Sequence, residues 1–114
     1  MHEYSIVQAL IEQCELEALA HKATNIHKVV IKVGKLSGVE PYLLQLAFDS
    51  FKEISTFCQS AVLEMSIQPV EILCYGCGTV SELTEHHYVC PKCHSSDISV
   101  TDGKEMFLMQ LEMV

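Results

Sequence analysis

Residues 74–93 have the sequence CYGCGTVSELTEHHYVCPKC and contain two Cys-X2-Cys pairs with twelve residues between them. Two residues between paired thiols let both sulfurs reach one ion from a tight turn, and two such turns complete a tetrahedron. Gly76 and Gly78 suit the sharp turn of the first pair, and Pro91 stiffens the second. We therefore predict a structural zinc site in which all four ligands are cysteines, namely Cys74, Cys77, Cys90 and Cys93.

The composition is that of a small protein with an appended module. The chain has 114 residues, of which 49% are hydrophobic, but the segment around the cysteines is poor in large aliphatic residues. A bound metal must therefore supply folding energy there. The N-terminus lacks the basic start and cleavage site of a signal peptide, and no run approaches the roughly 20 apolar residues of a membrane span. These features predict a cytoplasmic protein, in a reducing compartment where cysteines hold zinc rather than form disulfides.

The charge of the chain argues against nucleic acid as a partner. Seven Lys and Arg residues against fifteen Asp and Glu residues give a net charge of −8. Between residues 70 and 103 the only Lys or Arg is Lys92, although zinc ribbons that bind nucleic acid need cations facing the phosphates. Metal cations or a basic protein surface suit this charge better.

Hydrophobic periodicity predicts an α+β or α/β fold. The expected elements are helices at 4–21 and 41–54 and strands at 27–33, 61–67 and 106–113. The last strand is too apolar to stand alone, so we expect it to return to the sheet of the first half. The prediction is thus two helices packed on a three-stranded sheet, with an inserted zinc-ribbon-like module. The expected domains are 1–69 plus 104–114 and, for zinc, 70–103.

The N-terminus is a second candidate metal site. The α-amine of Met1, the amide of residue 2 and the imidazole of His2 can form fused chelate rings, and Glu3 could add a carboxylate. Nitrogen-rich coordination of this kind suits Ni(II) or Cu(II). On these residues alone, a solvated terminal histidine is the more common interpretation. His94, directly after Cys93, is a candidate to hydrogen-bond the zinc thiolates from outside the ligand set.

Other protein classes share parts of this pattern. Rubredoxin-like electron carriers bind iron with two similar cysteine turns, and spacing alone does not separate iron from zinc. Cys90-X2-Cys93-His94 also matches c-type haem attachment, which requires export and would leave Cys74 and Cys77 without a role. An enzyme is the least supported class, because the sequence offers no nucleophile motif or phosphate-binding loop.

Three motifs together resemble the HypA/HybF family of nickel-insertion accessory proteins. They are Met1-His2-Glu3, the stretch VGKLSGVEP at 33–41, and the two cysteine pairs with His94. The resemblance covers the whole chain. It implies that His2 is the essential nickel ligand, with Glu3 beside it, and that the four cysteines hold structural zinc. It also implies as partners the GTPase HypB and the [NiFe]-hydrogenase large subunit, with urease accessory proteins as a further class.

We therefore predict a non-catalytic metallochaperone. It binds Ni(II) at its N-terminus, delivers the ion for [NiFe]-hydrogenase maturation, or also for urease, and keeps Zn(II) as a structural ion. The alternative is a rubredoxin-like or zinc-ribbon adaptor without nickel transport.

Overall fold

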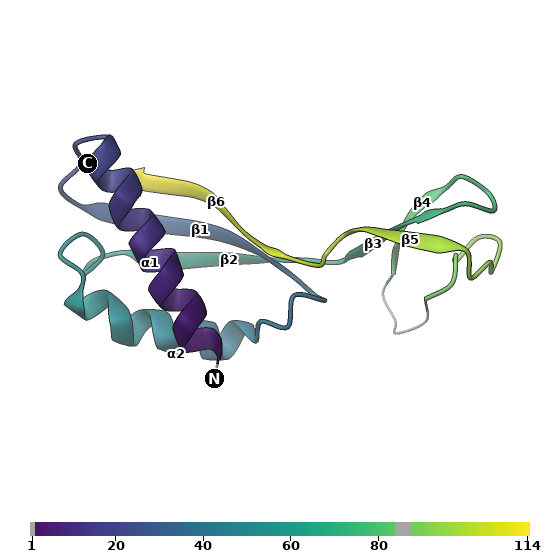
Figure 1. Cartoon of the computed structure of the whole chain (residues 1–114), viewed down its shortest axis with the longest axis horizontal. Helices are drawn as coiled ribbons and strands as arrows, with labels where there is room; N and C mark the ends of the chain where they lie inside the picture. The colour runs from purple at the N-terminus through teal and green to yellow at the C-terminus, as the bar shows by residue number, and fades with distance from the viewer. Residues whose placement is uncertain (1, 84–87) are drawn as a thin grey trace.

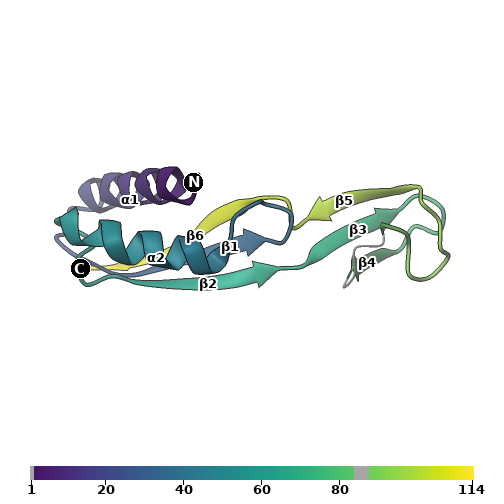
Figure 2. The same cartoon turned by 90° about the horizontal axis from the view of Figure 1, so that it is seen from below.

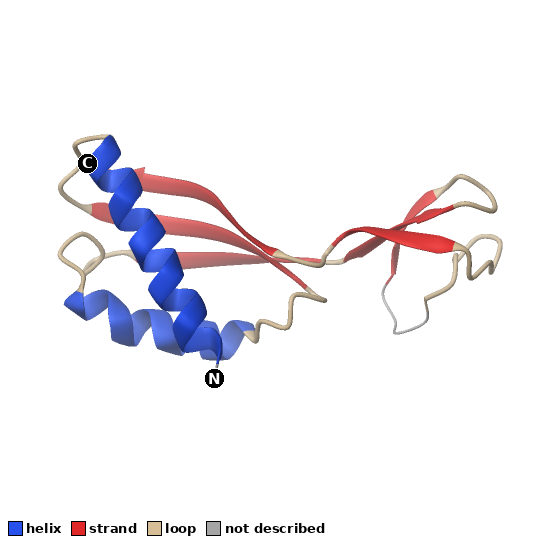
Figure 3. Cartoon of the chain, in the orientation of Figure 1, coloured by secondary structure: helices blue, strands red, loops and turns tan. Residues whose placement is uncertain are grey.

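The computed structural model describes residues 2–83 and 88–114, and among these residues it contains two α-helices and six strands (Figure 3). The helices are α1 (His2–Ala20) and α2 (Pro41–Phe51), and α2 continues into a short 3-10 helix, η1 (Lys52–Ile54). The strands are β1 (Ile26–Gly34), β2 (Val62–Gln68), β3 (Val70–Cys74), β4 (Val80–Leu83), β5 (Ile98–Asp102) and β6 (Met106–Met113). Neither helix is long and apolar enough to cross a membrane.

Both helices form because their apolar residues recur on one face. In α1 the buried side chains follow helical spacing, as Val7, Leu10, Ile11, Cys14 and Ala18 show. Pro41 occupies the first turn of α2, where its missing N–H costs no hydrogen bond. The predicted helix at 41–54 is thus correct in position, but its last three residues tighten into η1.

The first sheet has the strand order β2-β1-β6. β1 and β2 run parallel and are joined through α2, whereas β6 returns from the distant module to pair antiparallel with β1. Both helices lie on the same face of this sheet (Figure 2). They bury alternate residues of β1 (Val29, Ile31 and Val33) against side chains such as Phe48 of α2. The predicted arrangement of two helices on a three-stranded sheet is confirmed.

The second sheet has the order β4-β3-β5 and is antiparallel throughout. It extends away from the helices, so that the molecule measures 52 × 28 × 16 Å along its principal axes (Figure 1). Its core is small, consisting of Val70, Ile72 and Leu83 with two half-buried residues of β5 packed against them. The sequence analysis placed a metal-binding insertion here but did not predict that it has a sheet of its own.

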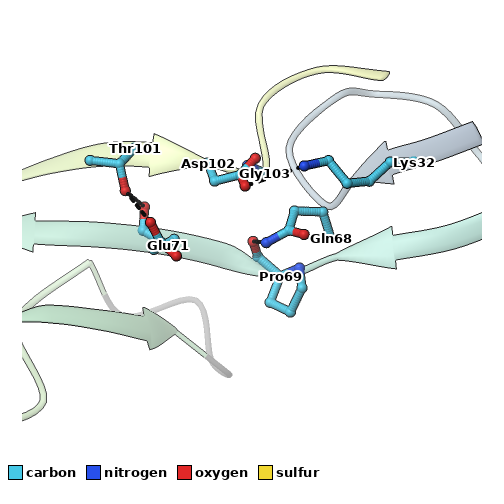
Figure 4. Close-up of polar contacts among 7 residues, drawn as sticks. All are labelled: Lys32, Gln68, Pro69, Glu71, Thr101, Asp102 and Gly103. Atoms are coloured by element: carbon cyan, nitrogen blue, oxygen red, sulfur yellow. Dashed lines mark hydrogen bonds and ion pairs between the residues drawn. The ribbon is translucent and has the colours of Figure 1, made fainter. Parts of the chain in front are cut away.

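The chain crosses from one sheet to the other twice. The first crossing is at Pro69, between β2 and β3, and the second is at Gly103, between β5 and β6. The backbone N–H of Leu36 donates to the carbonyl of Gly103 at 2.8 Å, and the N–H of Gly34 donates to that of Glu105 at 3.0 Å. The ammonium of Lys32 lies 3.4 Å from a carboxylate oxygen of Asp102 (Figure 4). The loop after β1 thus fastens the first sheet to the strand ends of the module.

Candidate metal centre

The four predicted cysteine ligands meet at the end of the second sheet. Cys74 is the last residue of β3 and Cys77 lies in the turn that follows, while Cys90 and Cys93 lie in the segment before β5. Their four Sγ atoms all lie within 4.8 Å of one another. None of them is in a disulfide bond.

The sulfur–sulfur distances fit a single tetrahedral ion. Sγ of Cys74 is 3.5 Å from Sγ of Cys93, and Sγ of Cys77 is 3.7 Å from Sγ of Cys90. A metal–sulfur bond of about 2.3 Å in a tetrahedron places its sulfurs about 3.8 Å apart, whereas a disulfide needs about 2.05 Å. The donor set is therefore arranged for a thiophilic ion, such as zinc.

The two cysteine turns repeat the same backbone structure. In each turn the first cysteine accepts a hydrogen bond from the N–H four residues later, from Gly78 to Cys74 and from His94 to Cys90, both at 2.8 Å. The N–H of each first cysteine also donates to the carbonyl five residues later, at 3.0 and 2.9 Å. Gly78 and His94 hold equivalent positions with φ of 71° and 62°. The repetition sets the two pairs of sulfurs around one centre.

Hydrogen bonds and the closeness of the thiols shift the pKa values of three cysteines in different directions. Hydrogen bonds with the hydroxyl and backbone of Thr79 lower the pKa of the exposed Cys77 to about 6. The Cys93 backbone N–H lowers the pKa of Cys90. The Ser95 backbone N–H also lowers the pKa of Cys93, but the neighbouring Cys74 thiol, burial and the other thiols outweigh it and raise that pKa to about 12. A divalent cation would remove this mutual repulsion.

His94 contributes its backbone N–H to the second turn, and its side chain is exposed. The metal-binding group formed by the described residues consists of the four cysteines. A hydrogen bond from the His94 imidazole to the thiolates stays a prediction.

Glu3, one of the predicted nickel ligands, lies in α1 beside the first sheet, away from the cysteines (Figure 1). Met1 and the side chain of His2 lie outside the described residues, but His2 is the first residue of α1. The side chain of Glu3 is only 8% exposed, and its carboxylate accepts a hydrogen bond from the backbone N–H of Glu40 at 3.4 Å. Glu3 therefore ties the start of α1 to the start of α2.

Glu40 is a neighbour of the N-terminus that the sequence analysis missed. It is the residue before Pro41, at the N-cap of α2, and its side chain is exposed. The signal was present in the motif at 33–41, because Pro41 marks a helix start whose preceding N–H needs an acceptor. Nothing in the sequence identified the Glu3 carboxylate as that acceptor.

The chain is similar to known proteins over nearly its full length. Residues 1–113 match the sequence family described as "Hydrogenase/urease nickel incorporation, metallochaperone, hypA". The hydrogenase maturation factor HypA of Shewanella sp. (strain MR-7) is 56% identical over 113 residues, covering 99% of this chain and 95% of that protein. The HypA of Campylobacter jejuni subsp. jejuni is 44% identical, with 99% of each chain covered.

A solved structure is similar as well. The solution structure of the Ni metallochaperone HypA from Helicobacter pylori superimposes with a TM-score of 0.73 at 39% identity. The match covers 100% of this chain and 98% of that one.

Proposed function

The chain belongs to the HypA family of hydrogenase nickel-incorporation metallochaperones, and from that premise we propose that it binds Ni(II) at its N-terminus and delivers it for [NiFe]-hydrogenase maturation. In this proposal the protein is a non-catalytic carrier in the cytoplasm. Its partners are the GTPase HypB and the hydrogenase large subunit, and urease accessory proteins are a further class.

Met1, His2 and Glu3 form the proposed nickel site. The amine, the amide and the imidazole of the first two residues supply nitrogen ligands that suit Ni(II). Glu3 is nearly buried and bonded to the Glu40 amide, so we assign it the role of placing the chelate and supplying negative charge. A terminal chelate can exchange its ligands one at a time with a recipient, which a carrier requires.

The four cysteines form the proposed zinc site. Four thiolates around one ion leave no open position, so the zinc stays bound and stabilises the turns. The small core of Val70, Ile72 and Leu83 explains why the module needs that ion. The observation that supports the proposal is that the four sulfurs gather at the end of the second sheet, whereas α1, which begins at His2, lies beside the first sheet (Figure 1).

Calorimetric titration with Ni(II) tests the proposal on tag-free, zinc-loaded protein. We expect tight binding in the wild type and its loss in His2→Ala, with the zinc content unchanged. His21→Ala is the matched control, because His21 is an exposed histidine just after the opposite end of α1. Equal nickel affinity in wild type and His2→Ala would refute the carrier mechanism and favour a zinc-stabilised adaptor.

Metal analysis of the same preparations tests the structural site. Cys74→Ser should lose zinc, whereas Cys58→Ser should keep it, because Cys58 belongs to the core of the first domain. Iron in place of zinc, visible as a red protein, would favour the rubredoxin-like alternative.

A further inference from the structure

β6 is an open edge of the first sheet. Among the described strands it pairs with β1 alone. Its eight residues, MFLMQLEM, include no Lys, Arg or Pro, the residues that commonly protect such an edge from pairing. Phe107 is 42% exposed and Met109 is 57% exposed. The pairing with β1 skips Met109, between Leu108 and Gln110, so the regular part of the edge is Gln110 to Met113. That stretch is able to accept another strand.

The backbone of β6 is set up for that pairing. Asn25 and Val114 exchange two backbone hydrogen bonds, at 2.9 and 3.2 Å, so the residue at 114 faces β1. Because this direction alternates along an antiparallel strand, the N–H groups of Met113 and Leu111 point toward the open side.

A groove runs between this edge and α1. It is a hollow of about 460 Å³, lined by Gln13, Glu17 and His21 on α1 and by residues 108–111 and 113 on β6. The floor is therefore apolar apart from Gln110, and the α1 wall is polar. Every second side chain of a strand points to the same face. One such row of side chains from an incoming strand would fit into this groove.

Charge identifies the kind of occupant. The acidic groups at this edge are Glu17 on the groove wall, 3.8 Å from the His21 imidazole, and Glu112 on β6, which pairs with Lys28 at 3.5 Å and remains half exposed. The chain as a whole carries −8. A second copy would bring the same acidic edge and the same net charge, and like charges oppose association. A segment whose Lys or Arg residues alternate with apolar residues would place its cations on the face of Glu112, which does not line the groove, and its apolar side chains in the groove.

We propose that β6 is a docking edge for an extended, basic segment of a partner protein, which adds to the first sheet as a fourth strand. Main-chain hydrogen bonds along the edge supply affinity, while alternate apolar side chains enter the groove beside α1. This inference goes beyond nickel transport and does not depend on it, because it involves neither the N-terminus nor the cysteines.

A synthetic peptide tests the edge directly. The probe is the blocked heptapeptide Val-Lys-Val-Thr-Val-Lys-Val, titrated into ¹⁵N-labelled, zinc-loaded full-length protein and followed by amide chemical shifts. We expect saturable shifts that are largest at Leu111, Met113 and the groove-facing residues of α1. A peptide of the same sequence, N-methylated at alternate residues on the pairing side, keeps its charge but should not bind.

Two variants with the same added charge separate edge pairing from general attraction. Met109→Lys should raise the dissociation constant of the peptide at least about tenfold, because it places a cation on the edge that faces a basic strand. Leu16→Lys should leave it unchanged, because Leu16 is 68% exposed and does not line the groove.

Four results would overturn the proposal. The first is an N-methylated peptide that binds as well as the parent, and the second is equal weakening of binding by both lysine variants. The third is the same set of shifts on raising the protein concentration without peptide, which would assign the edge to a second copy. The fourth is the absence of saturable shifts up to millimolar peptide.

Discussion

Two residues with the same left-handed backbone stand at equivalent places in the two cysteine turns, yet one is a glycine and the other is not. Gly78 adopts φ of 71° without strain, whereas His94 adopts φ of 62° with a side chain attached. For an L-residue this region costs roughly 1–2 kcal/mol. The second turn therefore tolerates strain that the first avoids, and the metal offsets it.

His94→Gly should relieve this strain. We expect zinc to bind about fivefold more tightly, which corresponds to about 1 kcal/mol of relief. Competition with a chromophoric chelator measures the affinity. Lys22→Gly is the matched control, because Lys22 also has positive φ (56°) but lies just after α1, so it should leave zinc affinity unchanged. Weaker zinc binding in His94→Gly would instead show that the imidazole supports the thiolates, as the sequence suggested.

The six cysteines divide into two chemical classes. Cys14 and Cys58 are fully buried in the first domain, and burial raises the pKa of both thiols, that of Cys14 to about 12. Cys77 is exposed, with its pKa lowered to about 6 by Thr79. Above its pKa a thiol is mostly the nucleophilic thiolate, so at pH 7 Cys77 is reactive and Cys14 is not.

Alkylation of metal-stripped protein should follow this order. With iodoacetamide at pH 7, we expect the four cysteines of the second sheet, which unfolds without its ion, to be modified first, and the buried Cys14 and Cys58 to react only when the first sheet unfolds as well. Mass spectrometry of digested time points measures the order. Zinc-loaded protein is the control, in which Cys77 should be protected. Early labelling of Cys14 would contradict the packing of the first domain.

At the scale of elements, the crossing of the two sheets is the most constrained place in the chain. A Cβ on Gly34 would stand against the carbonyl of Gly103, and one on Gly103 would stand 2.7 Å from the carbonyl of Pro69. These are backbone atoms, which do not move aside. Lys32 adds an ion pair to Asp102 and lies 5.5 Å from the centre of the Phe107 ring. Glycine at positions 34 and 103 allows the backbones to approach this closely.

Gly34→Ala should therefore destabilise the protein by about 3 kcal/mol, at the upper end of what single substitutions usually cost. Urea unfolding of the zinc-loaded protein measures the free energy. Gly38→Ala is the matched control, since no atom lies within 4 Å of its Cβ position and its φ of 77° should cost only about 1 kcal/mol. Equal losses in the two variants would show that the crossing is looser than described.

Sequence periodicity was sufficient for the elements of the first domain, because each has one buried face. It identified the helices and the returning last strand, and the spacing of the cysteines identified their cluster. It did not predict that Pro69 separates β2 from β3 into different sheets, because the apolar pattern continues across it. Nor did it predict the burial of Glu3 against Glu40, since that contact joins residues 37 positions apart.

At the scale of the whole molecule, two cores of unequal size are joined end to end. The radius of gyration is 17.4 Å, against about 13 Å for a compact chain of this length. Fifteen buried residues form the core under the helices, whereas three form that of the second sheet. The first domain is therefore expected to keep its structure when the second loses the metal.

Chelation of the metal at neutral pH should unfold the second sheet alone. We expect the amides of β3 and β5 to lose their protection from hydrogen exchange, while those of β1 remain protected. Exchange measured by mass spectrometry before and after chelation tests this. Re-addition of zinc should restore the pattern. Loss of protection in β1 as well would show that the crossing at Gly34 and Gly103 couples the two domains into one cooperative unit.

The elongated outline also has a hydrodynamic consequence. A body of 52 × 28 × 16 Å experiences more friction than a sphere of the same 12.8 kDa mass, and it tumbles anisotropically. On a gel-filtration column calibrated with compact standards, a single chain will therefore elute at the volume of a heavier protein. Light scattering weighs the particle independently of its shape, so it is the measurement that counts copies of this chain in solution.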